Sequence, residues 1–508
     1  MYAKQQDVDF DVIIIGAGIS GINFAYRLQE RNPKLSYCIL EERHEIGGTW
    51  SLFQYPGELE SAEDLRQKPI TNFAPPGIRS DSDLFTFGFS WRPWTKTHSI
   101  AHGSLIAEYV RDCAAEEGID KKIKFHHRVN QMSWSTELKT WSLDLTVDKT
   151  TSCNLQSRFI LLGTGYYDYH QALPADIPGI QNFTGTLVHP QYWPENLDYK
   201  DKEVVIIGSG ATAITLLPNI AKEARHVTIL QRSPSYILSV SSEDVVEKLI
   251  RLLLPKVLAV KLIRFKWIFV PLLLVNFCRR FPRLARKLLM VLTARELPRH
   301  MSLQPNFAPN YNPWEQRLCM CPESDFYESI GNGKADVRTG VIENVTGTSI
   351  RLKSGDELHP DIIVTATGLR LCIAGGIKIF VDGLQYHIGD NYLWKFAMMD
   401  NLPNAVLAFG YIDASWTLGA DFTAKLACRL LRKMKKDCAT MVVPRMGAEE
   451  KKKIKKLPFL DLKSTYVREA QNALPQVGDR SVWQPRPYYW RDLTVARYGS
   501  LQRGLEWT

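Results

Sequence analysis

The stretch Val12-Ile-Ile-Ile-Gly16-Ala-Gly18-Ile-Ser-Gly21 joins a β-branched run to three glycines spaced as GxGxxG. A helical pattern continues to about Arg31, and a second apolar run, Tyr37-Cys-Ile-Leu40, ends on Glu41. Gly16 permits a tight turn, Gly18 lets the backbone approach a pyrophosphate, and Gly21 packs the helix against the strand. The helix N-terminus favours an anion, and an acid at the end of the second strand can bind ribose hydroxyls. This context predicts a βαβ unit that binds FAD or NAD.

A second unit of the same kind contains Gly208-Ser-Gly210-Ala-Thr-Ala213, between the strand-like runs 203–207 and 227–230. Alanine is an accepted variant at the third glycine position. The second strand here ends in Gln231-Arg232-Ser233 and lacks the acid. An acid would repel a 2′-phosphate, whereas an arginine beside a hydroxyl can bind it. We therefore expect NADP here, with an Arg232 that is merely solvated as the alternative. The expected contacts are Gly208, Ser209, Gly210, Ala211, Thr212, Arg232 and Ser233.

Two further strand-to-glycine turns, Phe159-Ile-Leu-Leu-Gly-Thr-Gly165 and Ile362-Ile-Val-Thr-Ala-Thr-Gly368, follow the two units at their far ends. This nesting predicts an α/β fold with two Rossmann-like dinucleotide-binding domains, the NADP domain inserted in the FAD domain. The expected bounds are 1–182 and 369–508 for the two parts of the FAD-binding domain, and 183–368 for the NADPH-binding domain. A length of 508 residues agrees with more than one core, since single cores stop growing near ~250–300 residues.

The most specific motif is Phe183-Thr-Gly185-Thr-Leu-Val-His189-Pro-Gln-Tyr-Trp193-Pro194, which has the pattern FxGxxxHxxxW followed by proline. With this motif the chain resembles the flavin-dependent Baeyer–Villiger monooxygenases of the flavin-containing monooxygenase superfamily, over nearly its whole length. In the relatives that oxygenate nitrogen or sulfur, Tyr or Phe usually replaces the tryptophan. Further stretches are similar to the branch of the ethionamide-activating monooxygenase: Gly47-Gly-Thr-Trp50, Ile78-Arg-Ser-Asp81-Ser-Asp83, Pro313-Trp-Glu-Gln-Arg317-Leu and Ala414-Ser-Trp-Thr417.

The resemblance implies an enzyme that uses FAD, NADPH and O₂. Through a C4a-peroxyflavin it would insert one oxygen atom beside a ketone carbonyl and give an ester or lactone. The alternative is oxygenation of a sulfur or nitrogen centre by the same flavin chemistry. The expected substrate is a small hydrophobic ketone or thioether.

The resemblance also assigns roles to residues. Arg317 matches the family arginine that lies over the flavin and stabilises negative charge, and Asp81 matches the acid that sets its position. Arginine suits this role because it stays charged at any working pH. From the residues alone, an exposed ion pair worth ~0–1 kcal/mol is the alternative. The flavin-side contacts expected are Gly16, Gly18, Gly21, Glu41, Gly48, Thr49 and Trp50.

The fingerprint residues Phe183, Gly185, His189 and Trp193 are expected to couple the two domains. A single histidine between prolines and aromatic residues is usually a packing or linker residue. We therefore assign His189 to the hinge and not to proton transfer, and Trp193 to packing.

The nine cysteines argue against disulfide chemistry at the flavin. A pyridine-nucleotide disulfide reductase would need a reactive pair soon after Gly48, but no cysteine lies between Cys38 and Cys113. Cys319-Met-Cys321 lacks neighbouring histidine or cysteine partners, so no metal site is expected. Scattered thiols, and acids before the first strand in place of a basic leader, predict a cytoplasmic protein.

Residues 58–77 depart from the resembled pattern, in which Tyr-Pro-Gly runs directly into Ile-Arg-Ser-Asp. Two hypotheses stay open: a real surface loop, which is thermodynamically tolerable, or a retained intron of 60 nucleotides, in frame. The segment separates Trp50 from Asp81 in the chain. A nucleotide-binding pseudoenzyme is therefore the alternative function of another class.

The net charge of +9 comes from one segment. Residues 249–295 contain eleven basic residues and no acid, so the other 461 residues carry a net charge of −2. This segment belongs to an expected basic, apolar helical insertion at 241–310. Its longest uncharged run is too short for a spanning helix, so it predicts either an interfacial helix with peripheral membrane contact or ordinary packing with snorkelling cations. No nucleic-acid partner is expected, because no such module accompanies the cations.

Overall fold

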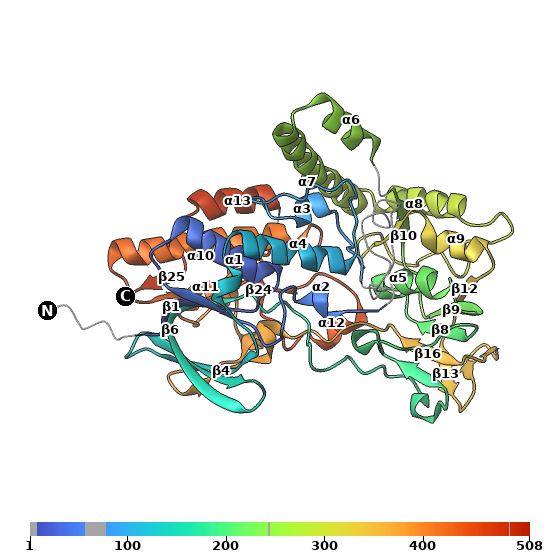
Figure 1. Cartoon of the computed structure of the whole chain (residues 1–508), viewed down its shortest axis with the longest axis horizontal. Coiled ribbons are helices and arrows are strands. Elements are labelled where there is room, and N and C mark those ends of the chain that lie inside the picture. Colours follow the sequence, from blue (N-terminus) through green and yellow to red (C-terminus); the bar gives the residue numbers. More distant parts are fainter. Residues whose placement is uncertain (1–7, 56–77, 242–243, 487) are drawn as a thin grey trace.

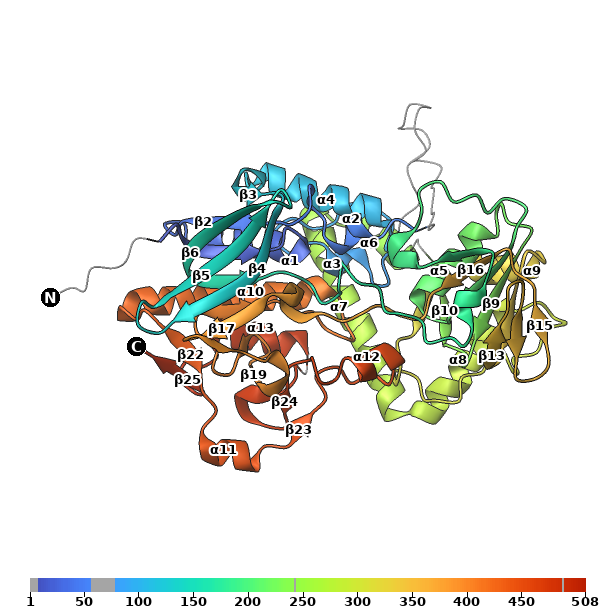
Figure 2. The same cartoon turned by 90° about the horizontal axis from the view of Figure 1, so that it is seen from below.

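A computed structural model describes residues 8–55, 78–241, 244–486 and 488–508. Within them the chain forms two main sheets, which lie in two lobes side by side along the long axis of the molecule (Figures 1 and 2). The segment 58–77 lies outside the described residues, so both hypotheses about it stay untested.

The larger sheet has nine strands in the order β18-β17-β4-β5-β6-β1-β2-β3, with β21 paired to β6. Strands β2, β1, β6 and β21 are parallel, and β4 and β5 extend the sheet in antiparallel fashion. The bounds are β1 (Phe10–Ile15), β2 (Tyr37–Leu40), β3 (Ile123–Lys124), β4 (His127–Ser135), β5 (Thr140–Val147), β6 (Thr151–Leu162), β17 (Lys378–Val381), β18 (Leu384–Gln385) and β21 (Ala405–Leu407).

Strand β1 is apolar on both faces because the sheet is covered on both sides. Val12 and Ile14 pack in one core with helices α1 (Ile19–Arg31), α4 (Gly103–Glu116) and α10 (Trp416–Asp437), whereas Ile13 and Ile15 belong to the opposite core. Consecutive side chains of a strand point to opposite faces, so a continuous apolar run is what such a buried parallel strand requires.

The smaller sheet has five parallel strands in the order β12-β9-β8-β16-β7. Its strands are β7 (Thr186–Val188), β8 (Glu203–Ile207), β9 (His226–Gln231), β12 (Ala335–Thr339) and β16 (Ile362–Thr365). Helices α5 (Ala211–Ile220) and α9 (Asp325–Gly331) cover one face, and the small sheet β13 (Ile342–Val345), β14 (Ile350–Leu352) and β15 (Glu357–Leu358) lies on the other.

The predicted fold class is confirmed: the smaller sheet is built from chain that lies between β6 and β17 of the larger sheet. The domain bounds 1–182, 183–368 and 369–508 stay predictions. The remaining named elements connect or flank the sheets: α2 (Thr49–Leu52), α3 (Leu84–Phe87), β10 (Ile237–Val240), β11 (Cys319–Pro322), β19 (Leu393–Trp394), β20 (Met398–Met399), β22 (Val442–Pro444), α11 (Ala448–Lys453), β23 (Lys456–Leu457), α12 (Thr465–Glu469), β24 (Val477–Gly478), α13 (Tyr489–Tyr498) and β25 (Leu505–Trp507).

The expected helical insertion contains α6 (Val245–Leu253), α7 (Lys256–Arg280) and α8 (Pro282–Glu296). Helix α6 and the start of α7 rise above the body of the molecule as a projecting hairpin (Figure 1). Across the described ranges, no helix has both the length and the apolar character that crossing a membrane requires.

Candidate active site

A cavity of about 1210 Å³ lies where the glycine turns of the two sheets meet. Its lining comes from both sheets, from α7 and from the C-terminal part of the chain. Pockets for one small ligand are ~300–1,000 Å³, so this cavity has room for more than one molecule.

The first glycine turn has no space for a side chain at Gly16 or Gly21. Gly16 has φ +99°, and a Cβ on it would lie 2.8 Å from the carbonyl oxygen of Gly163. A Cβ on Gly21 would lie 1.8 Å from the oxygen of Gly16, so this glycine provides the close approach of helix to strand. Gly16, Gly18 and Gly48 line the cavity, whereas Gly21 is not part of its wall.

Glu41 lies at the cavity with both carboxylate oxygens bonded to backbone. One oxygen accepts from the amide of Ala17 at 2.7 Å, and the other accepts from the amide of Arg43 at 2.9 Å. Burial raises the pKa of Glu41. Each carboxylate oxygen can accept more than one bond, so the arrangement leaves acceptor capacity for ribose hydroxyls.

Helix α2 brings Thr49 and Trp50 to the cavity wall. The hydroxyl of Thr49 lies 3.0 Å from the hydroxyl of Tyr169. The rings of Trp50 and Phe87 are packed edge to face, with their centres 5.2 Å apart. Trp50 and Asp81 line the same cavity, although residues 58–77 separate them in the chain.

The second glycine turn is built similarly but is more open. A Cβ on Gly208 would lie 2.2 Å from the oxygen of Ala366, whereas a Cβ on Gly210 would meet nothing within 4 Å. The hydroxyl of Ser209 donates to the carbonyl of Ser233 at 3.0 Å. Exposed Arg232 donates to the hydroxyl of Thr465 at 3.1 Å. All seven residues expected to contact NADP, from Gly208 to Thr212 with Arg232 and Ser233, line the cavity.

Both turns have features that fit an anionic dinucleotide. Gly18 and Gly210 are the N-cap residues of α1 and α5, and neither helix has an acid in its first turn. Helix N-termini attract anions through their free N–H groups and dipole. The buried hydroxyls of Thr164 and Thr367, in the turns opposite, have no hydrogen-bond partner among the described residues. Buried hydroxyls usually have hydrogen-bond partners. The unpartnered hydroxyls of Thr164 and Thr367 are therefore what we expect of turns whose partner is a bound polar ligand.

Arg317 and Asp81 form an ion pair at the cavity. About 44% of the Arg317 side chain and 41% of the Asp81 side chain remain accessible, so the pair is open to a bound molecule. The Asp81 carboxylate raises the pKa of Arg317, which therefore keeps its charge.

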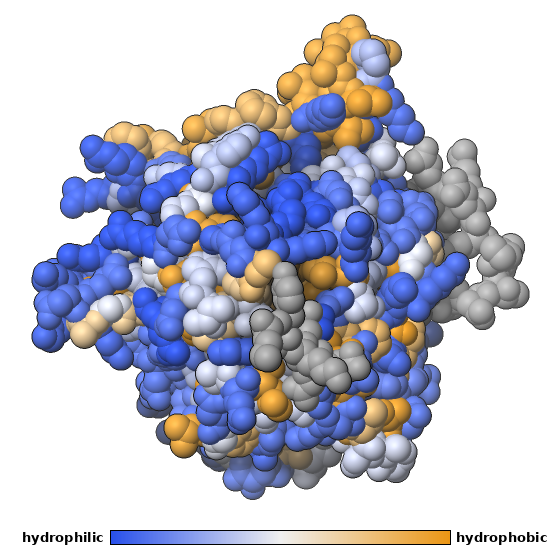
Figure 3. Space-filling view, turned by 90° about the vertical axis from the view of Figure 1, so that its left-hand side faces the viewer, coloured by the Kyte–Doolittle hydropathy of each residue, from blue (hydrophilic) through white to orange (hydrophobic). Residues whose placement is uncertain are grey.

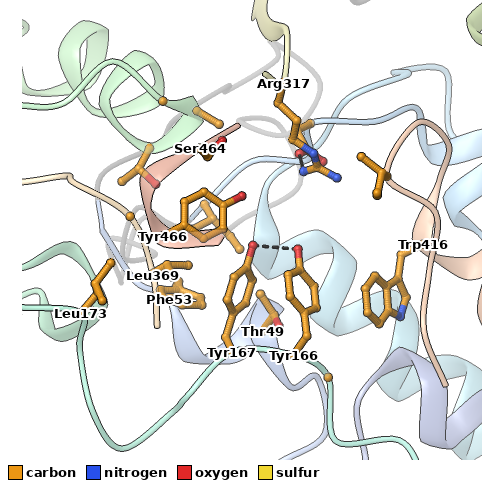
Figure 4. Close-up of a pocket in the computed structure, with 18 of the residues that line it drawn as sticks. Thr49, Phe53, Tyr166, Tyr167, Leu173, Arg317, Leu369, Trp416, Ser464 and Tyr466 are labelled. Atoms are coloured by element: carbon orange, nitrogen blue, oxygen red, sulfur yellow. Dashed lines mark hydrogen bonds and ion pairs between the residues drawn. The ribbon is translucent and has the colours of Figure 1, made fainter. Parts of the chain in front are cut away.

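Three tyrosines that the sequence analysis did not select lie below Arg317. In Figure 4 the hydroxyls of Tyr166 and Tyr167 point towards Arg317, and they lie 2.7 Å from each other. Tyr166 stacks on Trp416 with ring centres 4.9 Å apart. Burial raises the pKa of all three tyrosines, to about 12 at Tyr466, so their hydroxyls remain proton donors at neutral pH. Tyr166 and Tyr167 directly follow the glycine turn at Gly165. This position was the one feature of the sequence that could have placed them at the site.

The fingerprint residues Phe183, Gly185, His189 and Trp193 lie outside the cavity wall, around edge strand β7. A Cβ on Gly185 would lie 2.5 Å from the oxygen of Asp361. Nδ1 of His189 accepts from the amide of Gln191 at 3.2 Å, and burial lowers the His189 pKa. Phe183 and Trp193 pack on the two cores of the smaller sheet. Their coupling role stays a prediction.

Comparisons with known proteins find relatives by sequence and by fold. A family model described as "Pyridine nucleotide-disulphide oxidoreductase" matches residues 13–254. The chain is 41% identical over 493 residues to the FAD-containing monooxygenase EthA of Mycobacterium tuberculosis, which covers 97% of this chain and 96% of that protein.

Two solved structures share the fold. OTEMO in complex with FAD and NADP has a TM-score of 0.71 at 17% identity and covers 99% of this chain and 100% of its own. Cyclohexanone monooxygenase with bound ε-caprolactone has a TM-score of 0.71 at 17% identity, with 98% and 99% covered.

Disulfide chemistry, which the family model's description names, lacks its reactive pair here. Cys38 and Cys113 are buried in β2 and α4. Burial raises the pKa of Cys38 to about 12 and that of Cys113 to about 11, so both stay thiols, whereas the thiolate is the nucleophile.

Proposed function

The chain belongs to the family of FAD-containing monooxygenases, and on that premise we propose that it inserts one oxygen atom of O₂ beside the carbonyl of an apolar ketone. It is an NADP-dependent flavoprotein that acts on O₂ and an organic substrate. In the proposed reaction a ketone, NADPH, a proton and O₂ give an ester or lactone, NADP⁺ and water. One oxygen atom enters the product and the other leaves as water.

The observation that carries this proposal is the accessible Arg317–Asp81 pair in a cavity shared by both glycine turns. Bound FAD would be held by Gly16, Gly18, Glu41 and Thr49, and NADP by Gly210 and Arg232. The flavin supplies the activated oxygen with electrons from NADPH.

Arg317 has a defined role in such a reaction. When a nucleophilic oxygen adds to a ketone, negative charge develops on the former carbonyl oxygen. A cation fixed in advance at that place stabilises the charge, and a single donor of this kind is typically worth ~10²–10³ in rate. Asp81 holds the guanidinium in position while leaving it accessible.

The surrounding side chains favour an apolar substrate. Phe53, Trp267 and Leu369 line the same cavity as the tyrosines. Aromatic and aliphatic walls exclude water, and in a site with less water the Arg317 charge acts more strongly on a developing negative charge.

Product analysis under ¹⁸O₂ tests the proposal. The full-length FAD-loaded enzyme is given NADPH with cyclohexanone or with a thioether of similar size. We expect one ¹⁸O atom in ε-caprolactone, formed in step with NADPH oxidation. A labelled sulfoxide without any ester from cyclohexanone or from a long-chain ketone would replace this proposal with sulfur oxygenation.

A further inference from the structure

Residues 245–262, which we call the apolar tip, form an exposed apolar surface. Its side chains include Leu252, 80% exposed, Val245, 79% exposed, and Val257, 71% exposed. In Figure 3 the same projection stands out as a hydrophobic mass at the top of the molecule. Monomeric proteins rarely expose contiguous apolar surface of this kind, and such patches mark protein or membrane interaction sites.

The outward direction of these side chains is fixed by the polar face of the hairpin. On α6, Val245, Leu249, Leu252 and Leu253 share one helical face and are all exposed. On the opposite face, buried Glu247 accepts a hydrogen bond from the indole of Trp267 and lies 3.4 Å from the ammonium of Lys266.

Helix α7 is also tied to the body of the protein. The guanidinium of Arg264 donates to the carbonyls of Phe85 at 2.6 Å and Gly88 at 2.8 Å. Arg251 of α6 donates to the carbonyl of Lys96 at 3.2 Å. The polar contacts therefore face inwards, and the leucines and valines of the apolar tip are left facing solvent.

The charge around the apolar tip indicates the partner. Exposed Lys256 and Lys261 lie on the tip, whereas exposed Arg280, Arg283 and Lys287 lie at the other end of α7 and on α8. Between residues 249 and 295 the sequence contains no acid. An anionic lipid surface attracts such cations by ~1 kcal/mol each, while leucines and valines gain by leaving water. In a symmetric dimer through the same patch, the tip lysines Lys256 and Lys261 would be brought close to their copies and repel.

The same helix reaches the active-site cavity. Trp267, Ile268, Pro271 and Leu272 of α7 line the cavity, and Val257 lies about 15 Å from the nearest of them, Trp267, along the helix at ~1.5 Å per residue. The ring centres of Phe265 and Phe269 lie 5.7 and 5.3 Å from that of Trp490, and Trp490 also lines the cavity. An apolar face therefore continues from the tip to the cavity wall.

We infer that the apolar tip inserts into the surface of an anionic lipid bilayer and that the enzyme takes a lipophilic substrate from that bilayer along α7. The second part rests on the proposed ketone oxygenation. An interfacial helix buries its apolar face ~5–10 Å deep and does not cross the bilayer.

Vesicle flotation of the full-length FAD-loaded enzyme tests the first part. We expect binding to phosphatidylcholine vesicles that contain phosphatidylglycerol, weaker binding to phosphatidylcholine alone, and weaker binding in high salt. The double substitution L252E/V257E should reduce the partition coefficient at least tenfold. The matched control is L384E, because Leu384 is 76% exposed on β18, an edge strand of the larger sheet and not part of the tip.

Two results would overturn bilayer docking. One is equal partition of the wild type and L252E/V257E. The other is an absence of vesicle binding together with a dimer that L252E/V257E abolishes, which would assign the tip to a second copy of the chain. Unchanged FAD content and unchanged turnover of cyclohexanone show that L252E/V257E is folded, since neither residue lines the cavity.

Turnover of a membrane-bound ketone and of a water-soluble ketone tests the second part. With 2-tridecanone in anionic vesicles we expect L252E/V257E to lose at least fivefold in ester formation, with no change for water-soluble cyclohexanone. Equal turnover of 2-tridecanone by both proteins would overturn delivery from the bilayer. If no ketone gives an ester while vesicle binding persists, the proposed function fails and the docking surface stands.

Discussion

At the scale of single residues, the accessible charge of Arg317 is the feature on which the proposed chemistry depends. Lysine would keep the charge but not the planar guanidinium that can contact Asp81 and a substrate oxygen together. The spacing of Arg317 and Asp81 in the sequence does not predict that they form a pair. They come from distant parts of the chain, and only the fold makes them neighbours.

The first prediction concerns this arginine. Arg317→Ala should lower ester formation about 100-fold or more, because the developing oxyanion loses its cation, while FAD absorbance stays unchanged. The measurement is the rate of ester formation, with NADPH oxidation followed in the same assay. Arg351→Ala is the control, since Arg351 forms a similarly accessible ion pair with Glu357 outside the cavity. A wild-type rate of ester formation in Arg317→Ala would exclude the assigned role.

The second prediction concerns Asp83, a buried carboxylate at the N-terminus of α3. It accepts from the amide of Thr86 at 2.7 Å and from its hydroxyl at 2.6 Å, yet burial raises its pKa to about 6. A raised folded-state pKa gives stability that is fully present below the unfolded value of 3.8 and is lost as pH rises through about 6.

Asparagine keeps the cap without the charge. Asp83→Asn should therefore gain stability relative to the wild type between pH 4 and pH 7, by up to about 3 kcal/mol at ~1.36 kcal/mol per pKa unit. The measurement is the difference in apparent Tm at several pH values. Asp382→Asn is the control, because Asp382 makes the same pair of bonds to Thr136 at an exposed position where its charge stays hydrated. A difference that does not change with pH would contradict the burial cost.

At the scale of elements, the strand–turn–helix units form the two ends of the cavity at which we propose that the dinucleotide phosphates bind. In α5, Gly210 leaves open space at the helix N-terminus, so the amides can reach a phosphate. In the proposed site the turn residues contact the ligand, whereas the strands before them form the core.

The third prediction uses this open space. Gly210→Ala places a methyl group where the pyrophosphate would approach, so the Kd for NADP⁺ should rise at least tenfold with FAD content unchanged. Titration calorimetry of the FAD-loaded protein measures it. Gly447→Ala is a close control, because Gly447 is also an N-cap residue and a Cβ on it would meet nothing within 4 Å. An unchanged Kd would place the cofactor elsewhere.

The elements also show which features could be predicted from sequence. The two glycine turns were predictable because each is a strand–glycine–helix pattern contained in a short stretch of sequence. The atoms that leave no room for a Cβ on Gly16 and Gly208 belong to Gly163 and Ala366, which are distant in the chain. The tyrosines were not, since Tyr166 and Tyr466 meet only through tertiary packing. The hairpin α6–α7 was ambiguous, because interfacial and core helices share the same composition. The 80% exposure of Leu252 shows that this side chain is not part of the core, and the membrane contact itself stays a proposal.

At the scale of the whole molecule, the cavity couples the two sheets. Several contacts across it join the lobes: Arg317 to Asp81, Arg79 to Asp325 at 2.5 Å, and Lys463 to Glu315 at 2.9 Å. The smaller sheet is also attached to the larger one at both of its ends in the chain. Both features favour unfolding of the two lobes together.

The last prediction follows from this coupling. NADP⁺ binds only the native state and should stabilise it by about 2.7 kcal/mol at 100 times its Kd. Because residues from both lobes line the cavity, one unfolding transition of the FAD-loaded protein should move to higher temperature as a whole. Differential scanning calorimetry measures this, with NAD⁺ at the same concentration as the control. NAD⁺ should give a smaller shift, since it lacks the 2′-phosphate that Arg232 is expected to bind. Two separate transitions, of which NADP⁺ moves only one, would contradict the coupling, and equal shifts with the two nucleotides would contradict the role of Arg232.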